Sequence, residues 1–446
     1  MDSKLTHRGY RIPYSIVEYK QIKKDLTLKA NVPNGGYEYG NKPFPIYRNN
    51  LKFLYVPKFY GIKKYGKELI NEERKGESID LECKLKARPY QEPVISEIII
   101  KINKEDATIL SVPCAYGKTI CSLLIAHKLR AKTLILVHKE FLLNQWIERI
   151  NQCFHNPRIG TIQRNTIDVE DKDFVIAMLQ SVTTRKDSYP SSVFDSFAFT
   201  IVDECHHICA KSFSKALFQI STKKMLGLSA TPTRKDGLCV VLEHFFGSIT
   251  TFTVESSLVP EIRIVKAEYS KKHVPVINAI GKINLARLIT DISLDEVRNS
   301  QIVELIKELN SYGRKILVLT ERRTQCETLC DMLPFTVSKG LYMGGMKQCE
   351  LDISNTKDVI FATYSMAHEG YDNKVLDTLI FATGRTDIEQ SVGRIVRQKN
   401  AFVPLIVDIN DTAAGCLKSQ ATRRKNFYKS RGWIKEKPKE VVCHFI

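Results

Sequence analysis

The chain has 446 residues, of which 43% are hydrophobic and 26% charged, and its mean hydropathy is −0.19. These values are typical of an ordinary soluble globular protein of about three domains; they exclude a membrane protein, because no stretch approaches the ~20 apolar residues of a membrane span. The start, Met1-Asp2-Ser3-Lys4, lacks the apolar core of a signal peptide, and twelve cysteines without regular spacing indicate the reduced thiols of an intracellular protein.

The net charge of +18 is concentrated at the two ends of the chain. Residues 1–90 contain 19 Lys/Arg against 10 Asp/Glu, and residues 412–446 contain 9 against 2, so the stretch between them is nearly neutral. Solubility alone explains a high charge but does not explain its segregation. The pattern therefore favours a polyanionic partner, and nucleic acid in particular.

Residues 1–84 differ from the rest because aromatic side chains alternate with lysines and arginines. The turn signal Asn34-Gly35-Gly36 and the strand-end signal Val56-Pro57 predict a small β-rich domain. Aromatic rings can stack bases while cations hold phosphates, although any single ring can instead belong to the core of a small sheet. The mixed-charge run over residues 71–78 is typical of a solvated linker. The aromatic residues are Tyr37, Tyr39, Phe44, Tyr47, Phe53, Tyr55, Phe59 and Tyr60.

From about residue 85 the pattern changes to short apolar runs separated by helical segments. Such unalternating runs predict strands that are buried on both faces, and hence parallel sheets covered by helices. The first set is Thr108–Val112, Thr133–Val137, Phe174–Met178, Phe199–Val202 and Met225–Leu228. The second set is Lys315–Thr320, Val359–Thr363, Thr378–Ala382 and Pro404–Ile409. We therefore predict an α/β protein with domains at 85–257 and 258–410, followed by a basic tail, 411–446, that is helical over Thr422–Arg431.

A candidate phosphate-binding loop lies between the first apolar run and a predicted helix over Ile120–Leu129. A loop at a helix N-terminus presents backbone N–H groups to phosphate. Lys118 would then reach the β- and γ-phosphates, and the Thr119 hydroxyl would bind Mg²⁺. A standard loop of this type has glycine where Val112 stands. The full loop is Pro113, Cys114, Ala115, Tyr116, Gly117, Lys118 and Thr119.

Two carboxylates, Asp203 and Glu204, follow the apolar run Phe199–Val202. Ligands gather at the carboxyl ends of strands in open α/β sheets. Asp203 is therefore a candidate Mg²⁺ ligand and Glu204 a candidate for polarising the attacking water, the alternative being a helix cap with a first-turn acid. The next residues, Cys205, His206, His207 and Cys209, lack a second ligand pair. We expect no structural zinc and no iron–sulfur cluster.

Two later segments complete the candidate site. Small hydroxyls in Ser229-Ala230-Thr231-Pro232 can link the phosphate end of the first sheet to the second domain. Cys205, His206, His207 and Cys209 can pack or relay between nucleotide and strand, with His206 as the candidate for coupling. Arg394 and Arg397 are three residues apart, so one helical turn would place them on the same face as arginine fingers. Gln390 would orient them or contact the nucleotide. The alternative is a surface helix with solvated arginines. Together these parts predict a nucleoside triphosphatase with two domains that close on the nucleotide.

The ordered set of motifs resembles that of a superfamily-2 helicase of the DExH type, over about residues 85–410. This resemblance implies two tandem RecA-like domains and assigns Arg88 and Gln91 to adenine recognition. The matching segments are Arg88-Pro89-Tyr90-Gln91, Gly117-Lys118-Thr119 (motif I), Asp203-Glu204-Cys205-His206 (motif II), Ser229-Ala230-Thr231 (motif III), Ala362-Thr363 with Glu369-Gly370-Tyr371-Asp372 (motif V), and Gln390, Gly393, Arg394 and Arg397 (motif VI).

Within the superfamily, residues 227–237 and 342–347 are similar to helicases of large cytoplasmic DNA viruses related to the poxvirus transcript-release helicase, which is akin to XPB and UvsW. The resemblance implies a DNA-dependent ATPase that uses ATP and Mg²⁺, unwinds 3′–5′, prefers DNA to RNA and acts in transcript release, repair or branched-DNA processing. It also implies the transcription machinery as a partner, and the host cytoplasm and virion as locations. Ala115 and Tyr371 depart from the frequent glycine and aliphatic residue.

Residues at predicted strand ends are candidate contacts to nucleic acid. They would bind phosphate and sugar, so binding should tolerate any sequence and weaken with salt. The candidates are His138, Lys139, Gln145, Gln180 and Ser181 in the first domain and Thr320, Arg322 and Thr363 in the second. Two other functions stay open: an assembly factor that clamps nucleic acid with ATP and barely hydrolyses it, and an RNA helicase. Glu204 and the arginine pair argue against the clamp.

Overall fold

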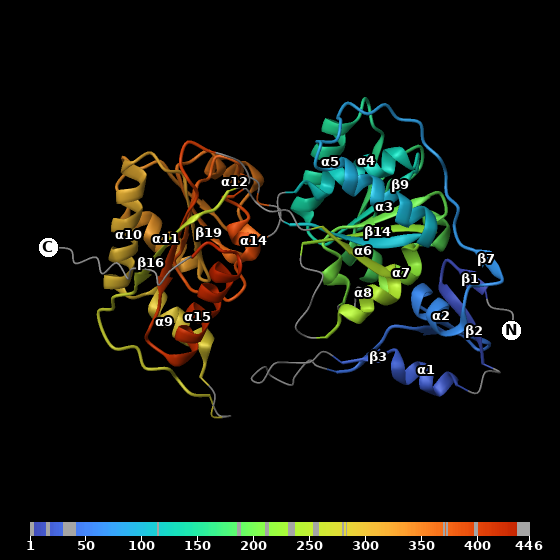
Figure 1. Ribbon diagram of the computed structural model, residues 1–446, viewed down its shortest axis with the longest axis horizontal. Coiled ribbons are helices and arrows are strands. Elements are labelled where there is room, and N and C mark those ends of the chain that lie inside the picture. Colours follow the sequence, from blue (N-terminus) through green and yellow to red (C-terminus); the bar gives the residue numbers. More distant parts are fainter. Residues whose placement is uncertain are drawn as a thin grey trace. The chain divides into compact units, whose positions relative to one another are not determined.

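The computed structural model divides into two compact units, Met1–Val254 and Glu255–Ile446, which are described separately (Figure 1). In the described part of the chain, no helix is both long and apolar enough to cross a membrane. The structure describes residues 4–14, 18–29, 42–113, 116–184, 189–209, 214–230, 237–252, 258–278, 281, 283–368, 371, 373–396 and 400–434.

Unit 1 is built around an eight-stranded sheet with the order β11-β10-β12-β9-β13-β14-β8-β15. All neighbouring strands are parallel except β10 and β11. The bounds are β8 (Ala107–Ser111), β9 (Thr133–Val137), β10 (Ile159–Gln163), β11 (Thr166–Ile167), β12 (Phe174–Met178), β13 (Phe199–Val202), β14 (Lys224–Ser229) and β15 (Ser248–Thr251). The central strands are buried along their whole length, which is why their sequences are apolar without alternation.

Helices cover both faces of this sheet (Figure 1). Along β9, Ile135 and Val137 pack with the helices of one face, whereas Leu134 and Leu136 pack with those of the other. The first face carries α3 (Glu92–Glu105), α4 (Lys118–Lys128) and α5 (Glu140–Cys153). The second carries α6 (Leu179–Thr184), α7 (Ser214–Ile220), α8 (Cys239–Phe246) and the short 3₁₀ turns η1 (Ser191–Phe194) and η2 (Cys205–Cys209).

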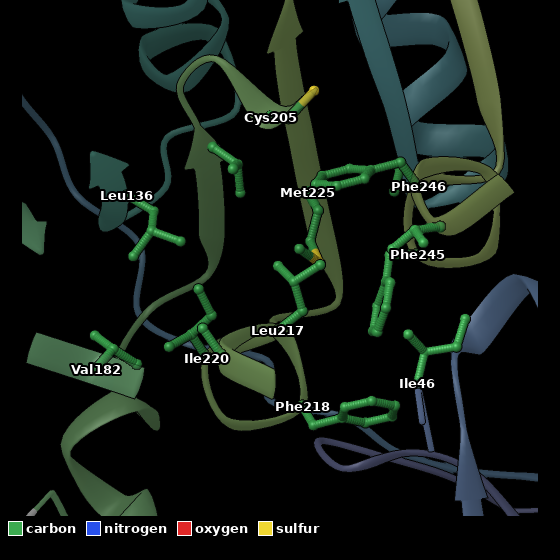
Figure 2. Close-up of a cluster of buried hydrophobic side chains, with 14 of the residues drawn as sticks. Ile46, Leu136, Val182, Cys205, Leu217, Phe218, Ile220, Met225, Phe245 and Phe246 are labelled. Atoms are coloured by element: carbon green, nitrogen blue, oxygen red, sulfur yellow. The ribbon is translucent and has the colours of Figure 1, made fainter. Parts of the chain in front are cut away.

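A small five-stranded sheet formed by the N-terminal residues packs on this second face. Its order is β5-β6-β2-β1-β7, with β1 and β7 parallel and the other pairs antiparallel. Figure 2 shows Ile46 of the N-terminal segment beside Phe218 and Phe245, and these residues share one hydrophobic core. The elements are β1 (Lys4–Thr6), β2 (Gly9–Pro13), α1 (Tyr19–Asp25), β3 (Thr27–Leu28) paired with β4 (Phe44–Pro45), β5 (Arg48–Asn49), β6 (Phe53–Val56), α2 (Lys58–Tyr65) and β7 (Ile70–Glu72).

The predicted small β-rich region is therefore present, and β6 ends at Val56 as its sequence indicates. Its core is shared with the large sheet, whereas the domain boundaries at 84, 257 and 410 stay a prediction. Tyr37, Tyr39 and the turn Asn34-Gly35-Gly36 lie outside the described residues.

The prediction of a solvated linker over residues 71–78 is wrong. Arg74 is buried, and its guanidinium donates hydrogen bonds to Asp195 at 2.7 Å and to the carbonyl oxygens of Ser191 and Gln219. Glu73 accepts from Lys58 at 2.8 Å. The mixed charges of this run are therefore partners of specific groups elsewhere in unit 1, which a local sequence pattern cannot reveal.

Unit 2 contains a six-stranded, fully parallel sheet with the order β16-β21-β20-β17-β19-β18. One face carries α10 (Glu296–Ser311) and α11 (Arg323–Met332), and the other carries α13 (Tyr364–His368), α14 (Glu389–Val392) and α15 (Gly415–Ser430). The remaining elements are β16 (Glu261–Lys266), α9 (Leu285–Ser293), β17 (Ile316–Thr320), β18 (Lys339–Tyr342), α12 (Gln348–Asn355), β19 (Val359–Thr363), β20 (Thr378–Phe381) and β21 (Leu405–Asn410). The predicted α/β class with two parallel sheets is confirmed.

The C-terminal helix begins at Gly415, seven residues before its predicted start at Thr422. It is anchored on the sheet of unit 2 by a buried ion pair between Arg424 and Asp408 of β21 at 2.7 Å. Tyr428 donates a hydrogen bond to the same carboxylate at 2.9 Å. This stretch is therefore part of the fold of unit 2 rather than a solvated tail, while residues 435–446 lie outside the description.

Candidate active site

The candidate residues of unit 1 follow neighbouring strands of the large sheet. Gln180 lies just after β12, His138 after β9, Asp203 after β13 and Pro113 just after β8, while Ser229 is the last residue of β14. These five strands are neighbours in the order β12-β9-β13-β14-β8. Because the five strands are parallel, their carboxyl ends meet at one edge of the sheet. The topology thus brings residues that are up to 116 positions apart in sequence to a single edge.

The loop between β8 and α4 depends on a glycine at its end. Gly117 caps α4 with φ of 93°, a left-handed conformation that favours glycine. A Cβ atom at this position would also lie 2.6 Å from Nε2 of Gln91. The glycine therefore allows the loop to approach Gln91 while α4 begins at Lys118 with its free N–H groups at the loop. Cys114 and Ala115 lie outside the described residues.

Gln91 holds this loop in place. Its Oε1 accepts a hydrogen bond from the backbone N–H of Arg88 at 3.0 Å, and its Nε2 donates to the carbonyl of Tyr116 at 3.0 Å. The rings of Tyr90 and Tyr116 meet edge to face at 5.1 Å. The amide of the predicted adenine reader is thus oriented by backbone on both sides, and it keeps one N–H and one lone pair that can bind adenine.

Lys118 and Glu204 form an ion pair in which Nζ lies 3.2 Å from Oε1. Glu204 has φ of 43°, a conformation that is uncommon outside glycine, and this directs the carboxylate that follows β13. Burial raises the pKa of Asp203, and the neighbouring charge of Glu204 raises it further. For Glu204 the charge and hydrogen bond of Lys118, with a smaller contribution from His206, outweigh burial and lower its pKa. Glu204 is therefore held as a carboxylate.

Asp203 is oriented by a tryptophan. Its Oδ2 accepts a hydrogen bond from Nε1 of Trp146 at 2.9 Å, and its Oδ1 accepts from the backbone N–H of Glu204 at 3.0 Å. A carboxylate has further lone pairs for a metal ion. Because burial and the charge of Glu204 raise the pKa of Asp203, a bound cation would favour the ionised form of Asp203. Together with the Thr119 hydroxyl, this set of oxygen donors fits Mg²⁺.

Three histidine rings form a continuous stack beside Glu204. His207 lies between His138 and His206, with ring centroids 4.1 and 4.4 Å apart. Nδ1 of His206 lies 3.2 Å from Oγ of Ser229 and 3.4 Å from Oε2 of Glu204. The stack therefore joins the end of β9, a candidate nucleic-acid contact, to Glu204 and to the end of β14. Thr231, the third predicted coupling residue, lies outside the description.

No three His, Cys, Asp or Glu side chains in the described ranges are placed to hold a metal ion together. The side chain of Cys209 is outside those ranges, and Cys205 is fully buried. The expectation that zinc is absent stays a prediction.

The other candidate contacts of unit 1 lie around the same edge. Gln180 donates a hydrogen bond from Nε2 to the carbonyl of His138, which ties α6 to the end of β9. Ser181 accepts from the backbone N–H of Arg164 at 2.9 Å. Lys139 caps α5 and lies over the ring of Phe141, and Gln145 precedes Trp146 in the same helix. Their contact with a nucleic-acid strand stays a prediction.

The arginine segment of unit 2 follows a short helix. The helix that contains Gln390 ends at Val392, Gly393 is its C-cap, and residues 393–395 form a turn. Arg394 is buried and donates from Nη1 to the carbonyl of Tyr371 at 2.6 Å. That Arg394 and Arg397 share one face stays a prediction. Arg397, Gly370 and Asp372 lie outside the described residues.

The candidate contacts of unit 2 are connected by hydrogen bonds. Thr320 is fully buried; its hydroxyl donates to Gln325 and accepts from the backbone N–H of Arg322 at 3.2 Å. Arg322 itself donates from Nε to Thr290 at 2.9 Å and from Nη2 to the carbonyl of Ala286. In this conformation the hydroxyl of Thr320 holds the backbone N–H of Arg322 in place. Thr363, at the end of β19, is near Ser365, with the hydroxyl oxygens 3.2 Å apart.

Sequence reasoning did not identify the partners of Trp146 and His207 in the site. Their partners Asp203 and His138 lie 57 and 69 positions away, so no local pattern signals either contact. The one available signal was position: both residues lie beside a strand end that already carried a candidate residue.

Comparisons with known proteins agree with this arrangement. The model of the family described as type III restriction enzyme, res subunit, matches residues 84–234. The chain is 34% identical to protein L396 of Acanthamoeba polyphaga mimivirus, named provisionally as an ATP-dependent RNA helicase, over 96% of this chain and 85% of that protein. It is 28% identical to protein 161L of Invertebrate iridescent virus 6, which is provisionally named a helicase. That alignment covers 80% of this chain and 84% of the viral protein.

Among solved structures, the helicase domain of Hef from Pyrococcus furiosus aligns with a TM-score of 0.50 and 14% identity. The alignment covers 77% of this chain and 98% of that domain. At this identity the likeness concerns the fold alone. It agrees with two RecA-like domains, each a parallel sheet covered by helices.

Proposed function

This chain belongs to the superfamily-2 helicases of large DNA viruses, and from that premise we propose that it is a motor that hydrolyses ATP to move along or unwind nucleic acid, with DNA as the preferred track. One observation carries this proposal. The lysine of the phosphate loop and the carboxylate pair of β13, which come from separate parts of the sequence, lie 3.2 Å apart between Lys118 and Glu204. These are the groups that bind and activate a nucleoside triphosphate.

The ion pair between Lys118 and Glu204 suggests how binding prepares the site for hydrolysis. An arriving triphosphate carries more negative charge than one carboxylate, so Lys118 exchanges Glu204 for the phosphates. Glu204 is then released as a carboxylate that can accept a proton from the attacking water. Thr119 and Asp203 would hold Mg²⁺, which neutralises charge on the phosphates when bound, while Trp146 keeps Asp203 oriented.

In unit 2 we propose that Arg394 and Arg397 stabilise the charge that develops on the transferred phosphate, with Gln390, Gly370 and Asp372 contributing to nucleotide binding. The resemblance of the motifs supports these assignments. Because Arg394 is bonded to the carbonyl of Tyr371, that bond is a candidate for exchange during the cycle.

The choice of nucleic acid is open to a direct test. The resemblance to XPB and UvsW favours DNA and a role in transcript release or DNA repair, whereas the name of the mimivirus relative favours an RNA helicase. The decisive comparison is steady-state ATP hydrolysis with single-stranded DNA, duplex, forked DNA and RNA. We expect DNA to stimulate turnover more than RNA; the reverse order would favour the RNA helicase.

Substitution of Glu204 tests the chemical assignment. Glu204→Gln keeps the size of the side chain but removes the base, so we expect turnover to fall by about 100-fold or more while nucleic-acid affinity is retained. Glu243→Gln, an exposed glutamate on α8, is the matched control and should hydrolyse ATP like the parent. Undiminished turnover in the Glu204→Gln protein would refute the role given to Glu204.

A further inference from the structure

The outer face of the small sheet carries a row of polar and aromatic side chains at paired positions. Arg48 on β5 pairs with Tyr55 on β6, Tyr55 pairs with Arg11 on β2, and Arg11 pairs with Lys4 on β1. Residues at paired positions point to the same face of a sheet. Leu54 and Val56 alternate with this row, point to the opposite face of the sheet and belong to the core. One end of the row meets α7, where the guanidinium of Arg48 lies 5.5 Å from the ring centroid of Phe218. The part of the row away from α7 contains Arg11, Phe53 and Tyr55.

Two aromatic rings and a guanidinium form a cluster within this row. The guanidinium of Arg11 lies 4.4 Å from the ring centroid of Phe53, and the rings of Phe53 and Tyr55 are 6.5 Å apart. All three side chains are half-buried, so each keeps part of its surface accessible. Nε of Arg11 is buried and has no hydrogen-bond partner among the described residues. The rings are thus held from below while part of their surface stays open.

The charges around the cluster are positive. Arg8, Lys52 and Lys215 are exposed near it, and the described residues show no ion pair for any of them. Arg48 is anchored, since its Nη2 donates to the carbonyl of Lys215 at 2.6 Å, and Lys4 is paired with Glu72. Burial and the nearby charge of Arg8 lower the pKa of Arg48, so an anion would relieve repulsion between these arginines.

This surface is separate from the candidate active site. The small sheet meets the large one over a cavity lined by Thr6 and Gly9 on one side and by Ala107 and Met225 on the other. Ala107 and Met225 lie at the amino ends of β8 and β14, whereas the active-site residues follow the carboxyl ends of these strands. A ligand on the small sheet would therefore occupy a second site.

We propose that this face, defined by Arg11, Phe53 and Tyr55, binds single-stranded nucleic acid by stacking bases on its two rings. Rings with open surface surrounded by cations are the elements of single-strand binding, because every base offers a flat surface and every nucleotide a phosphate. A duplex hides its base surfaces, and an acidic peptide would make no use of stacking. The inference rests on the proposed function only in the class of ligand, because binding here requires no turnover.

Photocrosslinking tests the stacking directly. A single-stranded oligonucleotide that contains 5-iodouracil is irradiated with the full-length protein in the absence of nucleotide, and tryptic peptides are analysed by mass spectrometry. We expect an adduct on the peptide of residues 53–58, which contains both rings. The double variant Phe53→Ala/Tyr55→Ala should lose this adduct and bind the oligonucleotide about tenfold more weakly.

Phe335→Ala provides the matched control. Phe335 is a fully exposed aromatic side chain in unit 2 with the ammonium of Lys339 5.4 Å from its ring, so it has the same chemistry at another place. This variant should crosslink and bind like the parent. The Lys118→Ala protein, which lacks turnover under the proposed function, should also keep the adduct, so failure of hydrolysis and failure of this surface are distinguishable.

Two results would overturn the assignment. The first is the absence of an adduct on residues 53–58 in the parent protein while other peptides crosslink. The second is an equal loss of affinity for single strands and for a blunt duplex in the double variant, which would mean that the face binds backbone phosphates without stacking.

Discussion

His207 shows how a residue without an obvious chemical role can support a reaction. No part in binding metal or phosphate is assigned to it, yet its ring lies between those of His138 and His206. His206 in turn contacts Ser229 and Glu204. We interpret His207 as a positioning residue. A nucleic-acid strand bound at the end of β9 would shift His138, and His207 would pass this shift through His206 to Glu204.

Removal of the ring tests this interpretation. We expect His207→Ala to lower nucleic-acid-stimulated kcat about fivefold to tenfold, because loss of an aromatic contact of about 1 kcal/mol leaves His206 less restrained. KM for ATP and the basal rate without nucleic acid should change little. His207→Phe keeps a ring in the stack and should restore most of the stimulation.

His127→Ala is the control for the loss of a histidine ring in the same unit. Its ring is tilted against Phe154, 6.0 Å away, and contacts no residue of the candidate site among the described interactions. Equal losses of basal and stimulated rates in the His207→Ala protein would contradict a role in coupling and indicate a general structural defect.

Among the elements, the segment from β7 to α3 is held by buried charges. Arg74 donates hydrogen bonds to Asp195 and to three carbonyl groups that lie more than 110 positions further along the chain. Since most of its side chain is buried, each of these bonds replaces water that the guanidinium would otherwise bind.

We expect Arg74→Ala to lower the free energy of unfolding of unit 1 by about 2–3 kcal/mol, below the range for a fully buried pair because Asp195 is itself largely exposed. Chemical denaturation of the full chain measures this change. Lys75→Ala, which alters the exposed neighbouring residue, should lie within about 0.5 kcal/mol of the parent. Equal stability of the two variants would show that the Arg74 contacts contribute nothing.

The elements also show what could be predicted from sequence. Strands β9, β12, β13 and β19 have the predicted bounds, because strands buried on both faces produce continuous apolar runs. Strands at or next to a sheet edge, such as β16 and β10, were missed, since their half-buried patterns resemble loops. The phosphate loop and the carboxylate pair were found from local motifs. The contacts of Trp146 and His207 and the burial of Arg74 were not, because they depend on contacts across the fold.

At the scale of the whole molecule, separate surfaces carry separate proposed tasks. The carboxyl edge of the large sheet in unit 1 brings together the phosphate loop, the carboxylates and the three histidine rings. We propose that the arginines of unit 2 act on the bound nucleotide and that the small sheet is a second surface for nucleic acid. The central claim is that ATP hydrolysis at the first of these sites drives movement along a strand.

Displacement of streptavidin from a biotinylated single-stranded DNA end tests this claim most directly, because it reports movement without requiring unwinding. We predict that the parent protein displaces streptavidin with ATP but not with a non-hydrolysable analogue, and that the Glu204→Gln protein binds the same DNA without displacing it. Displacement by the Glu204→Gln protein, or ATP hydrolysis by the parent with no displacement from either end of DNA or RNA, would contradict the account.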